Sequence, residues 1–225
     1  TMMIPMFLLK EKKSETNEDV PKDALSIKEA FNFSFKNKTF LYWMSTLFVM
    51  TIGLQLFLGA PGELFSSSGL NPTVVMASAF APVPLTIIVY NKVVKKFGLG
   101  VAYKYILSVF SVGMVVMFLC CIYGSKFTSI QSTIIGILGG VFVSFAIGAF
   151  FSITYSVPTH LAQQEFKKTG KSTAAMYFAV QGIFEGVAAG IGTGLILQNL
   201  KETNNIPLLP IIVIICCMIA FAMSF

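Results

Sequence analysis

The sequence contains one histidine, one tryptophan and no arginine among its 225 residues. Charged residues make up only 12% of the chain and hydrophobic residues 55%, which is more apolar than is usual for a soluble domain. The net charge of +6 comes from lysines that lie between apolar stretches rather than within one basic patch. The composition therefore argues against a soluble domain and against a nucleic-acid partner.

Motifs that carry common enzyme chemistry are also missing. There is no glycine-rich phosphate loop followed by Lys-Ser or Lys-Thr, no nucleophile elbow and no His-Glu-x-x-His. His160 lies near Glu165, but no second histidine or carboxylate cluster accompanies them, so the sequence predicts no metal site. We expect a protein that is not an enzyme and has no cofactor.

Six long apolar runs dominate the chain. Each is near or above the ~20 residues that an α-helix needs to cross a ~30 Å hydrocarbon core. Unpaired backbone groups are too costly in lipid, so these runs must be helical. The expected spans are about 41–60, 73–91, 102–123, 132–157, 174–199 and 207–225. The sequence thus predicts an all-α membrane protein with a six-helix transmembrane bundle over residues 40–225.

Lysine is concentrated in alternate segments between these runs. The lysine-rich segments are 10–38 with seven, 92–104 with four and 167–171 with three, and the lysine-poor segments are 61–72 with none and 124–131 and 200–206 with one each. This alternation follows the positive-inside rule. We therefore expect residues 10–38 and 157–173 to be cytoplasmic and residues 61–72 to be external.

The two ends of the chain suggest a piece of a longer membrane protein. Residues 1–9 are apolar but too short to cross, and we interpret them as the end of a preceding transmembrane helix. Residues 10–39 form the only long polar stretch and predict a cytoplasmic linker. Within it, residues 24–35 have the pattern of a short amphipathic helix, with a loop as the alternative. The last residues still belong to an apolar run.

Local signals mark the first two spans. Trp43 lies at the expected cytoplasmic edge of the first span, where aromatic belts occur. Asn71 followed by Pro72 predicts the start of the second span, because asparagine caps helices and proline suits the first turn. Pro82 and Pro84 within that span predict a kink.

Glycine and serine recur every four residues in the fourth and fifth spans. Small residues at this spacing line one stripe of a helix and allow another backbone to approach. We expect close packing, and helices that slide or rock against their partners, along these stripes. Their glycines include Gly140 and Gly148 in the fourth span and Gly182, Gly186, Gly190 and Gly194 in the fifth.

Glu185 lies near the middle of the fifth span. A charged side chain at the bilayer centre costs ~2.5–3.5 kcal/mol on insertion scales, so Glu185 must face a cavity or a partner. Two interpretations stay open: a substrate- or proton-coupled site, and a structural hydrogen bond to a neighbouring helix. Gln181 shares that face and could bind a hydroxylated ligand, and Gln55 in the first span is a further candidate.

Two segments carry a resemblance to a known family. Residues 157–194 read VPTHLAQQEFKKTGKSTAAMYFAVQGIFEGVAAGIGTG, in which an acidic residue, a Lys-Thr-Gly-Lys loop and the run AMYFAVQG follow one another. Residues 91–98 read NKVVKKFG. These segments resemble the glycoside–pentoside–hexuronide:cation symporter family, the melibiose-carrier branch of the major facilitator superfamily.

The resemblance implies a twelve-helix fold of two six-helix bundles, with this chain as the C-terminal bundle and the substrate at the midplane between them. The family's eleventh helix carries a glutamine and, about a turn later, a lysine that faces the sugar. Gln181 matches the glutamine, but Gly186 or Glu185 stands at the lysine position. The coupling cation, Na⁺ or H⁺, is implied to bind mainly to the N-terminal half.

Together these features predict a secondary active transporter of a bacterial inner membrane that carries a sugar or glycoside with a cation by alternating access. Its expected partners are the substrate, the lipid bilayer and an N-terminal six-helix half. Gating or cytoplasmic-face roles are expected for His160, Glu165, Lys92, Lys95, Lys96, Lys167, Lys168 and Lys171. A major facilitator carrier of a drug, peptide or lipid-like substrate is one alternative, and a non-transporting receptor or scaffold is another.

Overall fold

The computed structural model describes residues 35–67, 71–123, 126–169 and 174–223. Within these ranges the chain forms helices and no strand, and six helical segments are long and apolar enough to cross a membrane, which confirms the predicted fold class. Residues 1–9, and residues 10–34 of the expected linker with its amphipathic segment, lie outside the described ranges. The elements are α3 (Lys38–Gly59), α4 (Pro61–Ser67), α5 (Pro72–Phe80), α6 (Val83–Phe97), α7 (Leu99–Tyr123), α8 (Ser129–Thr169), α9 (Ala174–Ala189), the π-helix η2 (Gly190–Leu197), α10 (Gln198–Glu202), the 3₁₀ turn η3 (Ile206–Leu208) and α11 (Leu209–Met223).

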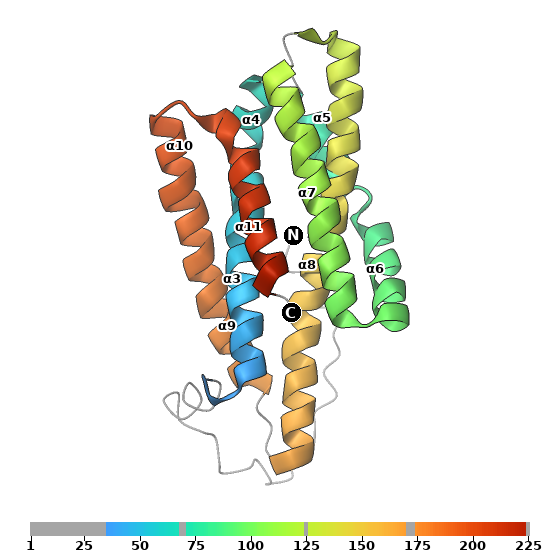
Figure 1. The fold of residues 1–225 in the computed structure, drawn as a ribbon, viewed down its shortest axis with the longest axis vertical. Helices are drawn as coiled ribbons and strands as arrows, with labels where there is room; N and C mark the ends of the chain where they lie inside the picture. The colour runs from blue at the N-terminus through green and yellow to red at the C-terminus, as the bar shows by residue number, and fades with distance from the viewer. Residues whose placement is uncertain (1–34, 68–70, 124–125, 170–173, 224–225) are drawn as a thin grey trace, which may run out of the picture.

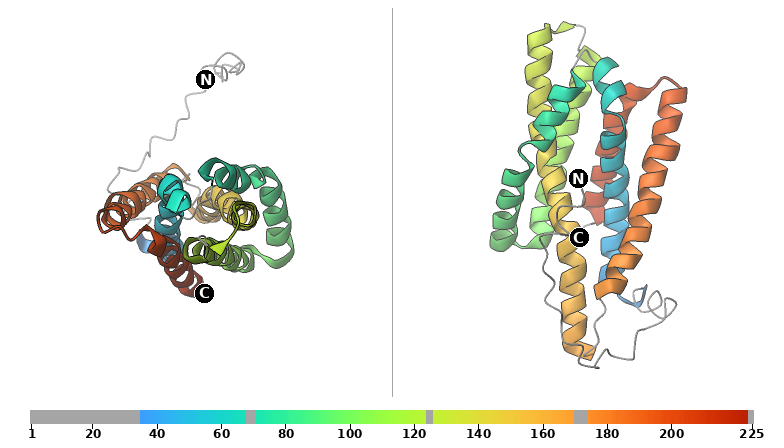
Figure 2. Two further views of the ribbon diagram at one scale, coloured as in Figure 1. Left: turned by 90° about the horizontal axis from the view of Figure 1, so that it is seen from above. Right: turned by 180° about the vertical axis from the view of Figure 1, so that it is seen from behind.

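The bundle is organised around α3 and α8. Helix α3 packs against α11, α9 and η2, whereas α8 packs against α5, α6 and α7. Contacts between α7 and α11 join these two groups. The views in Figures 1 and 2 place α9 and α10 on one flank of the bundle and α6 on the opposite flank. A continuous core of buried apolar side chains runs through the described helices.

The second span is broken where the prolines predict it. Asn71 caps α5, because its side-chain oxygen accepts hydrogen bonds from the backbone N–H groups of Thr73 at 3.0 Å and Val74 at 3.4 Å. Helix α5 ends at Phe80, and α6 begins at Val83 directly after Pro82. The predicted cap and the predicted kink are both present.

The fourth span extends further than its apolar run. Helix α8 continues through Pro158 to Thr169, so it extends beyond residue 157, where the predicted span ends. A proline inside a helix removes one backbone hydrogen bond, but membrane helices tolerate this when a neighbouring group satisfies the freed carbonyl. The helix also outlasts the apolar pattern because hydropathy reports the hydrocarbon core and not the end of the helix.

The glycines of the fourth span lie against the second span. A methyl group at Gly140 would overlap the Ser78 hydroxyl and lie 3.0 Å from the carbonyl oxygen of Val75. A methyl group at Gly148 would overlap the Thr86 hydroxyl. Helix α8 therefore approaches the backbone of α5 and α6 along this stripe.

The fifth span packs differently from the expectation. Apart from its chain neighbours and the nearby backbone of its own helix, no atom of the described structure lies within 4 Å of a Cβ built on Gly182, Gly186, Gly190 or Gly194. Within the described structure this stripe packs against no other helix, because larger side chains, including Tyr177 and Val180, occupy the buried face of α9. Close packing along the stripe stays a prediction. The close approach occurs instead within η2, where a Cβ on Gly192 would lie 3.1 Å from the carbonyl oxygen of Ile52.

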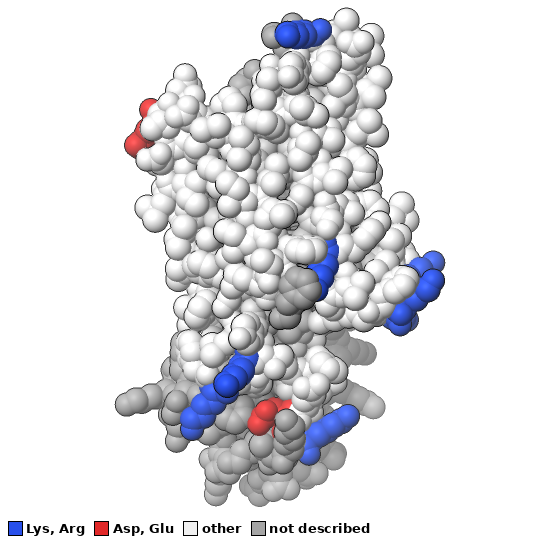
Figure 3. All heavy atoms as spheres, viewed as in Figure 1, with Lys and Arg blue, Asp and Glu red and all other residues white. Residues whose placement is uncertain are grey.

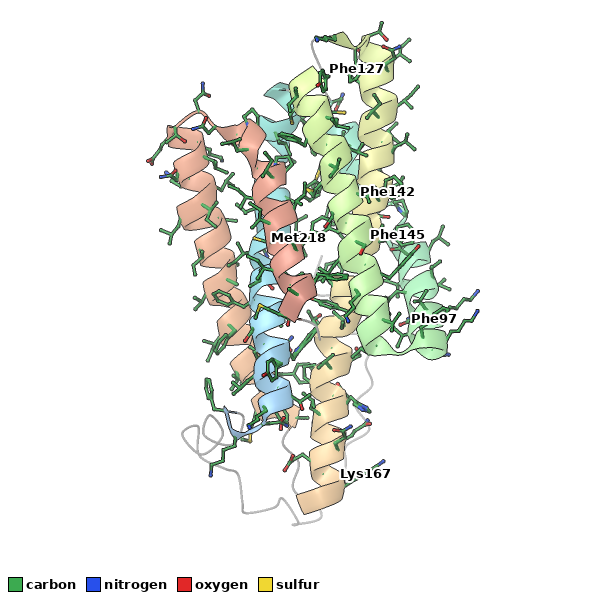
Figure 4. The ribbon with its side chains drawn as sticks, in the orientation of Figure 1. Phe97, Phe127, Phe142, Phe145, Lys167 and Met218 are labelled. Atoms are coloured by element: carbon green, nitrogen blue, oxygen red, sulfur yellow. The ribbon has the colours of Figure 1, made fainter. Side chains whose placement is uncertain are left out.

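Charged side chains are few on the surface of the bundle. Figure 3 shows lysine and acidic side chains near both ends and further lysine side chains about halfway along the length, with an uncharged surface between these lysines and the upper end. Figure 4 places Phe127 at one end of the bundle and Lys167 at the other. The uncharged surface between the upper end and the lysines halfway along the length suits contact with hydrocarbon.

Candidate functional site

Gln181 is the centre of a hydrogen-bond network that joins three helices. Its side chain is 4% exposed. The amide nitrogen donates to the backbone carbonyl of Thr154 on α8 and to the Glu185 carboxylate, both at 2.9 Å. The amide oxygen accepts from the indole N–H of Trp43 on α3 at 3.2 Å. The network thus fixes α9 to both α3 and α8.

The Thr154 carbonyl can accept a hydrogen bond from Gln181 because Pro158 stands four residues later in the sequence. A backbone N–H four residues later normally donates to a helical carbonyl, but here that residue is Pro158, which has no N–H. Gln181 takes its place from the neighbouring helix. A buried carbonyl without a partner would be costly, so this contact stabilises the helix at the proline.

Glu185 is half-buried and accepts its hydrogen bond from its own helix, one turn before it. Glu185 therefore makes no hydrogen bond of its own to a neighbouring helix in the described structure. Gln181 makes the interhelical hydrogen bonds, to Trp43 and Thr154. One carboxylate oxygen, Oε1, is held by Gln181. Within the part of the chain that the structure describes, no other hydrogen bond to Glu185 is formed.

Aromatic side chains surround the network. The Tyr177 hydroxyl accepts from the Asn37 amide at 3.2 Å, and the Tyr177 ring meets the ring of Phe40 with centroids 4.7 Å apart. On the other side, Tyr155 of α8 and Phe178 of α9 have ring centroids 6.2 Å apart. Tyr155 is 64% exposed, so this ring pair lies at the surface beside the buried Gln181.

Gln55 does not belong to this site. It lies twelve residues after Trp43 on α3, about 18 Å further along the helix axis. Its Cβ is instead near Gly192 of η2, at 3.5 Å from the position of an added methyl group. The structure therefore separates Gln55 from Gln181 and Glu185, with which it was grouped because all three are polar residues in apolar spans.

The cytoplasmic-face candidates form two separate groups. His160 and Lys167 are exposed and Glu165 is half-buried on the lower part of α8, where the His160 ring lies 3.0 Å from the Gln164 amide. The exposed lysines of the second group, Lys92, Lys95 and Lys96, lie in the last two turns of α6. The side chain of Lys168, and Lys171 as a whole, lie outside the described structure.

An ion pair on the opposite side of the bundle was not anticipated. The Lys201 ammonium on α10 lies 2.6 Å from the Glu63 carboxylate on α4. The hydrogen bond from Lys201, followed by one from the Glu63 backbone, holds the pKa of this carboxyl below its usual range. From sequence, Glu63 is simply a loop acid and Lys201 a single lysine after the fifth span, and nothing in their spacing pairs them.

Trp43 is the site residue that sequence reasoning missed. An aromatic belt residue is expected to face the membrane interface, but Trp43 is half-buried and points its N–H at Gln181. Its ring also meets Tyr103 of α7, edge to face, with centroids 6.1 Å apart. It lines a cavity of about 160 Å³ together with residues of α3, α7, α8 and α11 that include Tyr42, Thr46, Tyr103, Ile153 and Met223.

The chain was compared with family models, curated proteins and solved structures. The model of the family described as MFS/sugar transport protein matches residues 1–203 of the chain. No curated protein and no solved structure matches it. Among the described residues, no group of three histidine, cysteine or acidic side chains is arranged to hold a metal ion.

Proposed function

The chain belongs to the MFS/sugar transport protein family, and from that premise we propose that it forms the C-terminal bundle of a sugar:cation symporter. The family and the six apolar helices make it a multi-pass membrane transporter of the major facilitator superfamily. In the proposal, a second six-helix bundle completes the carrier and the substrate binds between the two. The melibiose-carrier branch and a bacterial inner membrane are parts of the same proposal.

The observation that carries the proposal is the position of Glu185. A carboxylate in the middle of a span is expensive, and such residues usually mark substrate or ion pathways. Glu185 is half-buried on α9 and oriented by a buried amide rather than neutralised by a lysine or arginine within the described structure. We assign it the coupling role, in which it binds the cation or the proton that drives uptake.

The surroundings of Gln181 support a sugar as the substrate class. Hydrogen-bonding groups and aromatic rings occur together here, in Glu185 and in the Tyr155–Phe178 pair. A carrier of drugs or lipid-like molecules would offer a wider and more apolar surface. Aromatic faces beside polar groups suit the mixed apolar and hydroxylated faces of a sugar ring.

The proposal is tested by transport with Glu185→Gln in the full-length carrier. Radiolabelled mono- and disaccharides are the substrates, with drug-like and peptide substrates in parallel. Accumulation against a gradient should be lost in this variant, whereas exchange of labelled for unlabelled sugar should survive because exchange needs no net cation movement. Unchanged accumulation would overturn the coupling role, and uptake only of drugs or peptides would overturn the substrate class.

Glu202→Gln is the matched control. Glu202 lies at the end of the same span and also accepts from a glutamine one turn earlier, with Gln198 Nε2 at 3.3 Å from its carboxylate. This pair is exposed, whereas the pair of Gln181 and Glu185 is partly buried. The same chemical change at Glu202 should leave accumulation intact.

A further inference from the structure

We infer that Trp43 is a positioning residue for Glu185 and that it acts through Gln181. This inference rests on the proposed coupling role of Glu185. It assigns Gln181 to the positioning of the carboxylate rather than to contact with the sugar, and it gives the single tryptophan of the chain a functional role.

The argument begins with the hydrogen-bonding capacity of each partner. An indole N–H can only donate, a backbone carbonyl can only accept, and an ionised carboxylate can only accept. Gln181 has one accepting end and one donating end. It meets the Trp43 N–H at 3.2 Å and the two acceptors, Thr154 and Glu185, at 2.9 Å each.

These three contacts allow only one orientation of the Gln181 amide. If the amide turned over, its NH₂ group would face the Trp43 donor, and its oxygen would face two acceptors. All three hydrogen bonds would be lost at once in a buried place, where an unsatisfied polar group costs ~1–3 kcal/mol. The Trp43 N–H therefore holds the donating end of Gln181 toward Glu185.

This arrangement leaves Glu185 as the group that can meet a ligand. Both hydrogens of the Gln181 amide are engaged by Thr154 and Glu185, so Gln181 has no hydrogen left to donate to a sugar hydroxyl. Glu185 has its Oε1 atom held by Gln181. A change in the charge of Glu185 should alter the hydrogen bond of the Trp43 indole, because the Gln181 amide is hydrogen-bonded to both side chains.

Other groups that titrate on the elements packed around Glu185 must be separated from it. On the described side chains of α3, α8 and α9 the charged or titratable groups are Lys38, Tyr42, Tyr155, His160, Glu165, Lys167 and Tyr177, and η2 carries none. Tyr103 of α7 also meets Trp43. Of these residue types, only histidine and glutamate have reference pKa values between about 3 and 8, so His160 and Glu165 are the residues to control for. Both lie on α8 beyond Thr154, with Glu165 about 16 Å along the helix.

The test uses Trp43 as its own reporter. The Trp43 fluorescence of the full-length carrier in lipid nanodiscs, with any tryptophan outside these 225 residues replaced by phenylalanine, is followed during a pH titration, after circular dichroism has shown that each variant is helical. The wild-type emission should change in a titration that Glu185→Gln abolishes and that Glu165→Gln leaves in place. An identical titration in wild type and in Glu185→Gln, or no titration in wild type, would overturn the inference.

A second measurement asks whether the contact matters for coupling. In the full-length carrier, Trp43→Phe removes the N–H donor and keeps an aromatic ring. It should reduce accumulation several-fold while sugar exchange is retained, since a positioning residue affects the coupled step alone. Equal losses of accumulation and exchange, or no loss of either, would overturn the positioning role.

The two proposals fail separately. If Glu185→Gln leaves accumulation intact but still abolishes the Trp43 titration, the link from Trp43 to Glu185 exists and the coupling role is wrong. If Glu185→Gln abolishes accumulation but the Trp43 titration is unchanged, Glu185 couples transport and Trp43 does not position it.

Discussion

The side chain of Gln181 donates to the one carbonyl, that of Thr154, that Pro158 leaves without its usual donor in α8. The proline in α8 and the glutamine in α9 are therefore structurally linked, because the glutamine supplies the hydrogen bond that the proline removes. The proline frees an acceptor at a defined height in the bundle, and the glutamine satisfies it from outside. Helix α8 can then continue past the proline to Thr169.

This relationship predicts strong coupling between the two positions. Gln181→Leu should lower the free energy of unfolding by about 1–3 kcal/mol, because it leaves the buried Thr154 carbonyl unsatisfied. In a Pro158→Ala background the alanine N–H can donate to that carbonyl, so Gln181→Leu should cost less. The measurement is a double-mutant cycle of unfolding in detergent. Additive effects would show that Gln181 does not compensate for the proline.

Two buried threonines on α3 provide a second prediction. Thr46 and Thr51 are 4% and 2% exposed, and the Thr46 hydroxyl donates to the carbonyl of Tyr42, whereas the Thr51 hydroxyl has no partner in the described structure. Thr51→Val keeps the shape and removes an unsatisfied group, so it should stabilise the bundle by about 1 kcal/mol. Thr46→Val should be neutral or slightly destabilising. Equal effects in thermal unfolding would mean that the Thr51 hydroxyl is satisfied.

The six membrane-spanning helices could be predicted because the length and polarity of each segment of sequence are enough to identify a span in lipid. An apolar run near 20 residues must be a helix, and its lysine-rich flanks belong on one side. The cap at Asn71 and the break at Pro82 were predictable for a similar reason, since each depends on neighbouring residues only. The extension of α8 to Thr169 was not, because it depends on a side chain of another helix.

The candidate site could be predicted in part. Glu185 and Gln181 stand out because polar residues are rare in apolar spans. The role of Trp43 depends on a contact between residues 138 positions apart, and that of Thr154 on one across 27 positions. Polarity alone also grouped Gln55 with the site, although the helix rise places it far away. Composition identifies polar residues in the membrane, but only the packing shows which of them meet.

Replacing glycine by alanine should change the stability of the bundle in opposite directions in the two glycine stripes, that of the fourth span and that of the fifth. Gly148→Ala should destabilise the bundle, because its methyl group would overlap the Thr86 hydroxyl and lie 3.3 Å from the backbone of Ile87. Gly186→Ala meets open space in the described structure and should stabilise it by roughly 0.5–1 kcal/mol, the difference in helix propensity. Unfolding of both variants in detergent checks this. A destabilising Gly186→Ala would show that this stripe packs against a helix after all.

The orientation in the membrane can be tested at two exposed lysines. Lys126 follows the third span and Lys95 ends the second, so the positive-inside pattern places them on opposite sides. In intact cells a membrane-impermeant thiol reagent should label Lys126→Cys and not Lys95→Cys, and Lys95→Cys should react once the cells are opened. The parent chain controls for the four native cysteines. Labelling of Lys95→Cys alone in intact cells would reverse the assigned topology.

The ion pair between Glu63 and Lys201 predicts a dependence of stability on pH. The pKa of Glu63 is lowered in the folded chain, chiefly by the hydrogen bond from Lys201. Its contribution is therefore present above the pKa of an unfolded glutamate, about 4.3, and is lost as the pH falls through the lower folded pKa. Both side chains are substantially exposed, so solvent screening limits the gain to roughly 0.2–1 kcal/mol.

The measurement compares the unfolding of wild type and Glu63→Gln from neutral pH down to about pH 3. Wild type should be more stable at neutral pH, and the difference should shrink as the pH falls through the lowered pKa of Glu63 in the folded chain. High salt should shrink the difference at neutral pH, because exposed charges are screened. Glu202→Gln is the control, since Glu202 accepts from a neutral glutamine rather than from a lysine. A difference between wild type and Glu63→Gln that stays constant across the pH range would mean that the side chain stabilises α4 by packing, and that the charge pair contributes nothing.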